Sequence, residues 1–169
     1  MKTARYFAAF GLALAIGAGA FSAIESVGVR QMAPSVAYTL LDGTPSSTDA
    51  LRGKVVLVNF WATSCASCVH EMPRIAATHE RFKARGFETL AVAMSYDPPA
   101  AVVGFAQSRQ LPFGVVIDNT GAVARAFGDV RLTPTTLLIN KRGEVVKRYL
   151  GEPDFVALER LVEALLVEG

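Results

Sequence analysis

The chain has 169 residues, of which 51% are hydrophobic and 19% charged, so it can bury the core of one globular domain. Its formal charge of +2 comes from Lys2 and Arg5, since the other 15 basic residues balance 15 acidic ones. The basic residues are scattered, without the basic stripe of a nucleic-acid-binding protein, so we expect no nucleic-acid partner. Two cysteines allow at most one disulfide, which excludes a miniprotein held together by several disulfides.

Residues 1–30 are predicted to be a targeting segment. Two positive charges precede an uncharged run from Tyr6 to Ile24, which as a helix would reach about 28 Å, close to the thickness of a bilayer's hydrocarbon core. This length favours a retained signal anchor, whereas Ala18-Gly19-Ala20 fits the cleavage site of a signal peptide. In both cases the order of charges places the chain beyond residue 30 outside the cytoplasm.

The rest of the chain alternates between short apolar runs and longer amphipathic ones, which predict strands and helices respectively. In chain order we expect a strand at 35–43, a polar turn through residue 48, a strand at 55–61, a helix to about 85, a strand at 87–94, a helix from 97–99, a strand at 115–118, a short helix to 128, a hairpin of 135–140 with 144–150, and a helix at 154–167. This order predicts an α/β fold, with a central mixed sheet flanked by helices.

The only cysteines, Cys65 and Cys68, lie three positions apart where the strand at 55–61 gives way to a helix. Unpaired N–H groups and the helix dipole favour an anion there, which lowers the pKa of a thiol. The thiolate is the attacking species in disulfide exchange. The spacing therefore predicts a redox pair in which Cys65 attacks a client disulfide and Cys68, one turn further in and more buried, resolves the mixed disulfide.

Other interpretations of the cysteine pair are weaker. A structural zinc site needs four ligands, and only His70 and His79 remain, which cannot easily converge with both sulfurs; we therefore expect no metal. A passive disulfide would close a loop too short to constrain the unfolded chain much. A Cu(I) metallochaperone stays open as an alternative, because two thiolates and a third soft ligand bind Cu(I). We expect His79 at the surface and His70 solvated on the outer face of its helix.

Several motifs carry a resemblance to a known family: Val58-Asn59-Phe60-Trp61-Ala62-Thr63, Cys65-Ala66-Ser67-Cys68, Glu71-Met72-Pro73 and Thr133-Pro134-Thr135-Thr136. Together they resemble the thioredoxin-fold proteins of the exported, often membrane-anchored TlpA-like group of thiol-disulfide reductases, which includes cytochrome c maturation proteins. The resemblance covers about residues 34–167 and implies a thioredoxin-like domain at 34–169, behind the signal segment at 1–30.

The resemblance also implies roles for individual residues. It places a cis peptide before Pro134, beside the cysteines, and lets the backbone of Thr133 pair with the client peptide. Glu71 is expected to carry protons to or from Cys68, and Trp61 to shape the floor of the substrate-binding site. The catalytic residues would therefore be Cys65, Cys68 and Glu71, and the substrate-binding residues Thr133, Pro134 and Trp61.

The sequence departs from the family pattern before and between its cysteines. Ser64 stands where many members have tryptophan, and Asn59 stands where many thioredoxins have a buried aspartate. The dipeptide Ala66-Ser67 also lacks the common proline. These differences leave the reduction potential of the site open.

The predicted function is the reduction of disulfides in exported client proteins by dithiol–disulfide exchange. The only redox group is then the Cys65–Cys68 disulfide itself, with no separate cofactor, and a membrane thiol carrier is the expected electron donor. The protein would lie on the periplasmic side of the inner membrane, anchored by residues 1–30, or be soluble in the periplasm after cleavage. A dithiol oxidase is the alternative of the same fold, because direction depends on the relative stability of the two redox forms.

Overall fold

The structure, a computed structural model, describes residues 31–168, so the predicted signal segment at 1–30 lies outside the described residues. Among the described residues, no helix has both the length and the apolar character needed to cross a bilayer.

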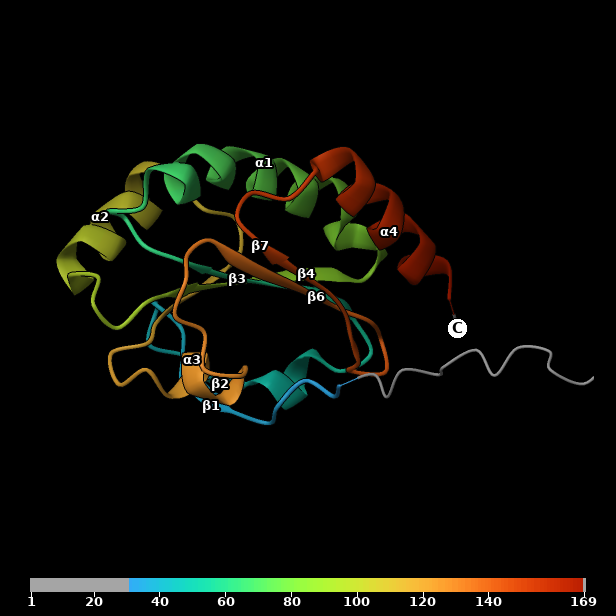
Figure 1. Cartoon of the computed structure of the whole chain (residues 1–169), viewed down its shortest axis with the longest axis horizontal. Coiled ribbons are helices and arrows are strands. Elements are labelled where there is room, and N and C mark those ends of the chain that lie inside the picture. The colour runs from blue at the N-terminus through green and yellow to red at the C-terminus, as the bar shows by residue number, and fades with distance from the viewer. Residues whose placement is uncertain (1–30, 169) are drawn as a thin grey trace, which may run out of the picture.

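A five-stranded mixed sheet forms the centre of the molecule, in the order β5-β4-β3-β6-β7 (Figure 1). Its strands are β3 (Val55–Trp61), β4 (Phe87–Ala93), β5 (Gly114–Ile117), β6 (Thr135–Ile139) and β7 (Val145–Leu150). β3, β4 and β5 are parallel, whereas β6 and β7 are antiparallel to their neighbours. The expected α/β architecture with a mixed sheet is therefore confirmed.

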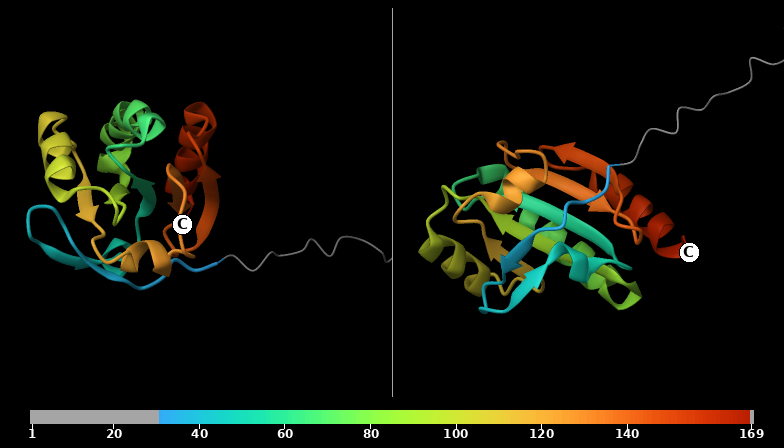
Figure 2. Two further views of the ribbon diagram at one scale, coloured as in Figure 1. Left: turned by 60° about the vertical axis from the view of Figure 1, so that its left-hand side comes forward. Right: turned by 90° about the horizontal axis from the view of Figure 1, so that it is seen from below.

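Helices cover both faces of this sheet, as Figure 2 shows. One face carries α1 (Ala66–Phe82), α2 (Pro99–Ser108) and α4 (Phe155–Val167), and the other carries the short α3 (Ala122–Ala126). Each face buries its own apolar cluster. All seven residues of β3 are buried because the strand lies between β4 and β6 and both of its faces are covered by other elements. Such a strand must be apolar on both faces, as its sequence VVLVNFW largely is.

One expectation about the polar parts of the chain is wrong. The turn predicted through residue 48 contains a second strand, β2 (Pro45–Ser47), which pairs with β1 (Ala37–Thr39). Its polar residues gave no strand pattern. The tight turn at Gly43, whose φ is +87°, brings them against β1, where backbone pairing defines the strand. The 3₁₀ turns Thr48–Leu51 and Lys83–Arg85 complete the described elements.

His79 is buried, with 4% of its surface exposed, instead of lying at the surface as expected. It lies on the face of α1 that packs against the sheet, with its Nδ1 3.2 Å from Thr89 Oγ1 and its ring 5.4 Å from that of Phe113. Desolvation by burial lowers its pKa. A histidine on an amphipathic helix can face either side, and the sequence did not show which.

Asp154 begins α4 by accepting hydrogen bonds from the backbone N–H groups of Val156 and Ala157, at 2.9 and 3.2 Å. Replacing it with alanine leaves these donors without a side-chain acceptor, and we expect a loss of about 1 kcal/mol in the free energy of unfolding. Urea denaturation measures this. The exposed Gln107→Ala on α2 is the control and should change stability little; equal losses in the two variants would contradict the capping role.

Candidate active site

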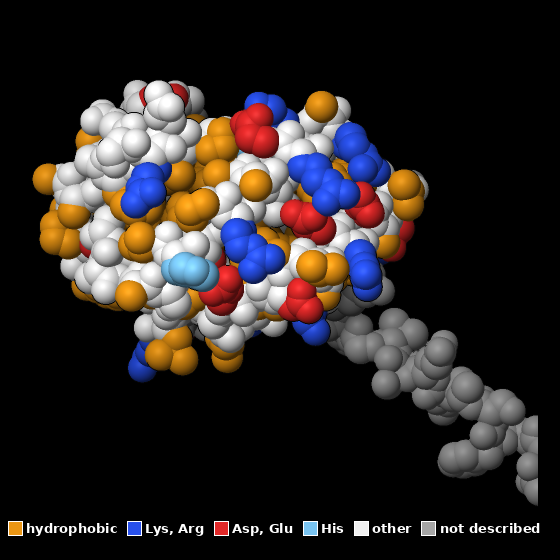
Figure 3. Space-filling view, turned by 90° about the horizontal axis from the view of Figure 1, so that it is seen from above, with side chains coloured by type: hydrophobic (Ala, Val, Ile, Leu, Met, Phe, Trp, Pro, Cys, Tyr) orange, Lys and Arg blue, Asp and Glu red, His pale blue; other side chains and the backbone are white. Residues whose placement is uncertain are grey.

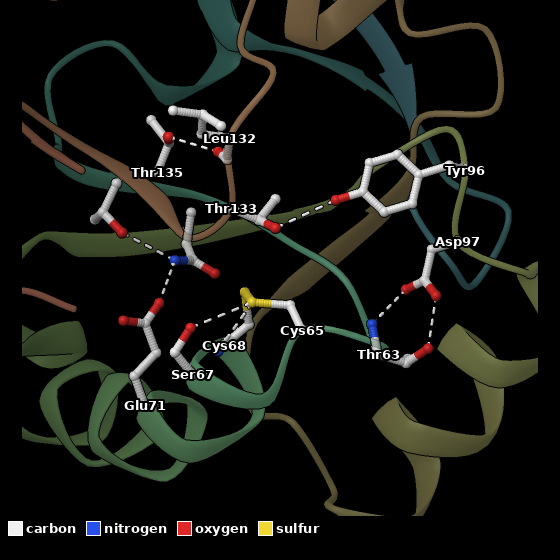
Figure 4. Close-up of a disulfide and its surroundings, with 12 residues drawn as sticks. Thr63, Cys65, Ser67, Cys68, Glu71, Tyr96, Asp97, Leu132, Thr133 and Thr135 are labelled. Atoms are coloured by element: carbon white, nitrogen blue, oxygen red, sulfur yellow. Dashed lines mark hydrogen bonds between the residues drawn. A yellow bond between two sulfur atoms is a disulfide. The ribbon is translucent and has the colours of Figure 1, made fainter. Parts of the chain in front are cut away.

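The two cysteines lie at the point where β3 passes into α1. Cys65 is the N-cap of α1, and its sulfur accepts a hydrogen bond from the backbone N–H of Cys68 at 3.2 Å. The two residues form a disulfide, with their Cα atoms 5.2 Å apart (Figure 4). Cys65 is partly exposed and Cys68 is fully buried. Of the two sulfurs, that of Cys65 is therefore the one that a client can reach.

A buried polar network extends from the sheet to α1 on the Cys68 side of the site. Asn59 Nδ2 donates hydrogen bonds to Glu71 Oε1 and to Thr136 Oγ1, each at 2.9 Å. Asn59 and Thr136 meet because the register of β3 and β6 places them directly opposite each other. The side chains of all three residues are fully buried. The network thus fixes Glu71 on the helix that carries Cys68, one turn further along and on the same face.

The environment of Glu71 favours its neutral form. Desolvation by burial raises the pKa of this carboxyl from 4.5 to about 7, outweighing the hydrogen bond from Asn59, which lowers it. The negative charge of Glu152 raises it further, and His70 opposes that with a smaller effect. A carboxyl group with this pKa exists in both protonation states near neutral pH, as an acid–base group requires.

Three buried side-chain atoms of the described residues have no hydrogen-bond partner, and all three lie on β3 or α1: Asn59 Oδ1, Trp61 Nε1 and Glu71 Oε2. Buried polar atoms are usually paired, so each of these three calls for an explanation, and a catalytic role is one. The free oxygen of Glu71 is able to hold a proton without breaking the bond that its other oxygen accepts from Asn59.

The loop before β6 lies across the disulfide from α1. The peptide bond between Thr133 and Pro134 is cis, as expected. Figure 4 shows Thr133 next to Cys65, and its hydroxyl lies 3.2 Å from that of Tyr96. Within residues 31–168, neither the backbone N–H nor the backbone C=O of Thr133 makes a hydrogen bond. Both groups are therefore available to an extended peptide.

Trp61 lies beneath the site and not on its surface. Its side chain is fully buried in the same apolar cluster as Cys68, with its ring 5.0 Å from that of Phe105. A side chain with no exposed surface cannot touch a client. Trp61 therefore supports the site from below, and the prediction that it binds substrate directly is corrected.

The structure also brings Asp97 into the site, although no motif of the sequence predicted a role for it there. This aspartate follows β4 and is 2% exposed. Its two carboxylate oxygens accept hydrogen bonds from the backbone N–H and the hydroxyl of Thr63, each at 2.6 Å. The sequence feature that could have indicated this role is its position at the carboxyl end of a strand next to β3, because functional groups gather at that edge of an α/β sheet.

The structure brings neither histidine to the sulfurs. His70 is exposed, with its Nδ1 3.2 Å from Glu152 Oε2, and His79 packs against β4. The described residues contain no cluster of three or more histidine, cysteine or acidic side chains suited to a metal ion. In Figure 3, acidic and basic side chains alternate over the α4 side of the helical face, and the side toward α2 is mostly apolar or uncharged.

This fold and this disulfide define a thiol-disulfide oxidoreductase of the thioredoxin-like class. Residues 28–164 match the family model described as Redoxin, and the chain belongs to that family.

Known relatives agree with this class. The chain is 37% identical over 131 residues to the thiol-disulfide oxidoreductase ResA of Bacillus subtilis (strain 168), covering 78% of this chain and 72% of that protein. It is 36% identical over 145 residues to ResA of Geobacillus kaustophilus (strain HTA426), covering 86% and 82%.

Solved structures show the same similarity. A putative thioredoxin from Neisseria meningitidis is 42% identical, with a TM-score of 0.74, covering 79% of this chain and 88% of that one. A putative thiol:disulfide interchange protein DsbE from Chlorobium tepidum is 30% identical, with a TM-score of 0.72, covering 81% and 96%.

Proposed function

We propose that this oxidoreductase works as a reductase of disulfides in exported client proteins. The observation that carries the exchange mechanism is the asymmetry of the pair, with the sulfur of Cys65 accessible at the N-terminus of α1 and that of Cys68 buried beside it, and the resemblance to exported reductases supports the direction. The Cys65 thiolate attacks one sulfur of the client disulfide, and the other client sulfur leaves as a thiolate. Cys68 then attacks Cys65, which releases the second client thiol and leaves the Cys65–Cys68 disulfide. Two electrons pass to the client.

Glu71 is proposed as the acid–base group of the second step. Cys68 must lose its proton to become the attacking thiolate, and the buried side of the site offers little water to accept it. An ionised Glu71 on the same face of α1 takes this proton and returns it in the reverse direction. A pKa of about 7 suits both transfers at neutral pH.

The client is proposed to bind in an extended conformation along the loop at Thr133 and Pro134. The unpaired N–H and C=O groups of Thr133 would form backbone hydrogen bonds with the residues next to the client cysteine, as in strand addition. Such bonds hold any sequence, which fits an enzyme with several clients.

The place of the reaction is proposed to be the periplasmic side of the inner membrane. The charge-led apolar segment at residues 1–30 supports this, either as an anchor or as a signal peptide that leaves a soluble protein. After each turnover the Cys65–Cys68 disulfide must be reduced again, and a thiol carrier in the membrane is the proposed donor.

Equilibration of the full chain with glutathione redox buffers tests the direction. A reductase should remain mostly disulfide in a buffer poised at about −200 mV, because its dithiol form gives up electrons more readily than the buffer does. It should also reduce insulin disulfides with dithiothreitol as the electron source. A protein that is mostly dithiol at this poise, and that oxidises a reduced unfolded substrate, would instead be the oxidase.

A further inference from the structure

We propose that Asp97 is a positioning residue for the exchange reaction: through Thr63 it holds the loop that presents Cys65, and its charge disfavours the dithiol form relative to the disulfide. The inference rests on the proposed function only in taking Cys65 as the attacking thiol. It concerns a residue to which neither the cysteine motif nor the cis-proline motif assigns a role.

The loop between β3 and α1 is held by the residues that follow β4. The backbone N–H of Met94 donates to the carbonyl of Trp61 at 3.0 Å, where β3 ends. Three residues after Met94, Asp97 accepts hydrogen bonds from both the backbone N–H and the hydroxyl of Thr63. Asp97 is itself fixed by its own backbone N–H, which donates to the carbonyl of Met94 at 2.9 Å. The position of the chain two residues before Cys65 is thus set from the neighbouring strand.

Capping of the helix that follows it does not explain Asp97. An aspartate just before a helix usually accepts N–H groups of that helix, as Asp154 does for α4 and Asp118 does for α3. The N-cap of α2 is Pro98, and no side chain caps that helix. The carboxylate of Asp97 instead accepts hydrogen bonds from the active-site loop, as Figure 4 shows.

The charge of Asp97 has no cationic partner among residues 31–168. Thr63 and Cys65 are separated by two peptide units, so their Cα atoms lie at most about 7 Å apart. The carboxylate of Asp97 is buried and bonded to Thr63, so its charge is poorly screened, and it disfavours a second negative charge on the nearby Cys65 sulfur. It therefore opposes the stabilisation that the N-terminus of α1 gives to the thiolate. A less stable thiolate makes the dithiol a stronger reductant.

Asp97→Asn removes the charge of the side chain but can keep its hydrogen bonds to Thr63. The asparagine oxygen still accepts the N–H of Thr63, and its amide can donate to the hydroxyl of Thr63. We expect the equilibrium with glutathione to shift about tenfold toward the dithiol, a change of about 30 mV. The rate of alkylation of Cys65 by iodoacetamide, followed against pH, should rise at a lower pH than in the wild type.

Asp118→Asn is the matched control, because Asp118 is also a buried aspartate at the carboxyl end of a strand, but its carboxylate accepts hydrogen bonds from the backbone of α3 and not from the active-site loop. It should lower the melting temperature and leave the glutathione equilibrium within twofold of the wild type. An unchanged equilibrium and pH profile in Asp97→Asn, or an equal shift in Asp118→Asn, would overturn the charge effect.

Thr63→Val tests the positioning part if Asp97→Asn fails to fold. It keeps the charge and the backbone bond but removes the hydroxyl bond to Asp97. We expect the rate constant for reduction of a disulfide substrate to fall at least threefold and Thr63→Ser to restore it. A rate equal to that of the wild type in Thr63→Val would overturn the positioning role. Since glutathione serves as the partner, a wrong proposal about clients or direction would leave these shifts intact.

Discussion

Cys68→Ser should accumulate mixed disulfides with client proteins on Cys65, whereas Cys65→Ser should form none and lose all exchange activity. The reason is the difference in exposure: the sulfur of Cys65 is accessible at the N-cap of α1, and that of Cys68 is fully buried. Without Cys68 the first attack still occurs, but no thiol is placed to release the client.

Non-reducing gels of cell extracts, followed by mass spectrometry of the trapped complexes, provide the measurement. The double variant with both cysteines replaced is the control for disulfides unrelated to the site. If Cys65→Ser traps clients as well as Cys68→Ser does, the assignment of the attacking sulfur is reversed. The same experiment identifies the clients, because each trapped peptide carries the attacked cysteine.

Glu71→Gln should slow the exchange reaction by about tenfold or more at pH 7 to 8, with a smaller effect at pH 5. The variant keeps the shape of the side chain and can still accept the hydrogen bond from Asn59, but it cannot take a proton. Because the pKa of Glu71 is raised to about 7, the wild-type carboxyl becomes a base only as the pH approaches neutrality. Single-turnover reduction of a disulfide substrate between pH 5 and 8 measures the effect.

The same substitution should change how stability depends on pH. The folded state holds the proton of Glu71 up to about pH 7, and the unfolded chain releases it near 4.5. Between these values the folded state binds more protons, so its stability falls as the pH rises through this window. Glu71→Gln lacks this fall, and we expect it to gain about 2 kcal/mol relative to the wild type between pH 4 and pH 8, less than the full linkage energy because of screening.

Urea denaturation at several pH values measures this gain. Glu80→Gln, on the exposed side of the same helix, is the control and should follow the wild-type curve. Parallel stability curves for Glu71→Gln and the wild type would show that the carboxyl of Glu71 is not buried as a titrating group in the folded protein.

The parts of the site that lie close together in the chain could be predicted from the sequence. An apolar strand ends just before Cys65, and this local pattern predicts that Cys65 and Cys68 lie at the start of a helix. Glu71 follows Cys68 by three residues, so any helix places the two on one face. The cis peptide at Pro134 and its place beside the cysteines came from the resemblance to known proteins, not from a local pattern.

The remaining contacts depend on how distant segments pack. Asn59 and Thr136 are 77 positions apart, and only the register of β3 and β6 brings them together. Asp97 reaches Thr63 because β4 lies next to β3 and its carboxylate turns away from α2. The burial of His79 likewise depends on which side of α1 it faces, and the sequence alone left that undecided.

The attachment of the reactive loop to the most enclosed strand of the sheet has a consequence for recognition. β3 is paired along both edges, and the residues after it are bonded to the end of β4. We therefore expect this scaffold to change little when a partner arrives, so the partner must adapt its own conformation. Newly translocated or incompletely folded chains can do this without breaking folded structure, although they lose conformational entropy when they become ordered, whereas a compact protein with a rigid interior crosslink should be a poor substrate.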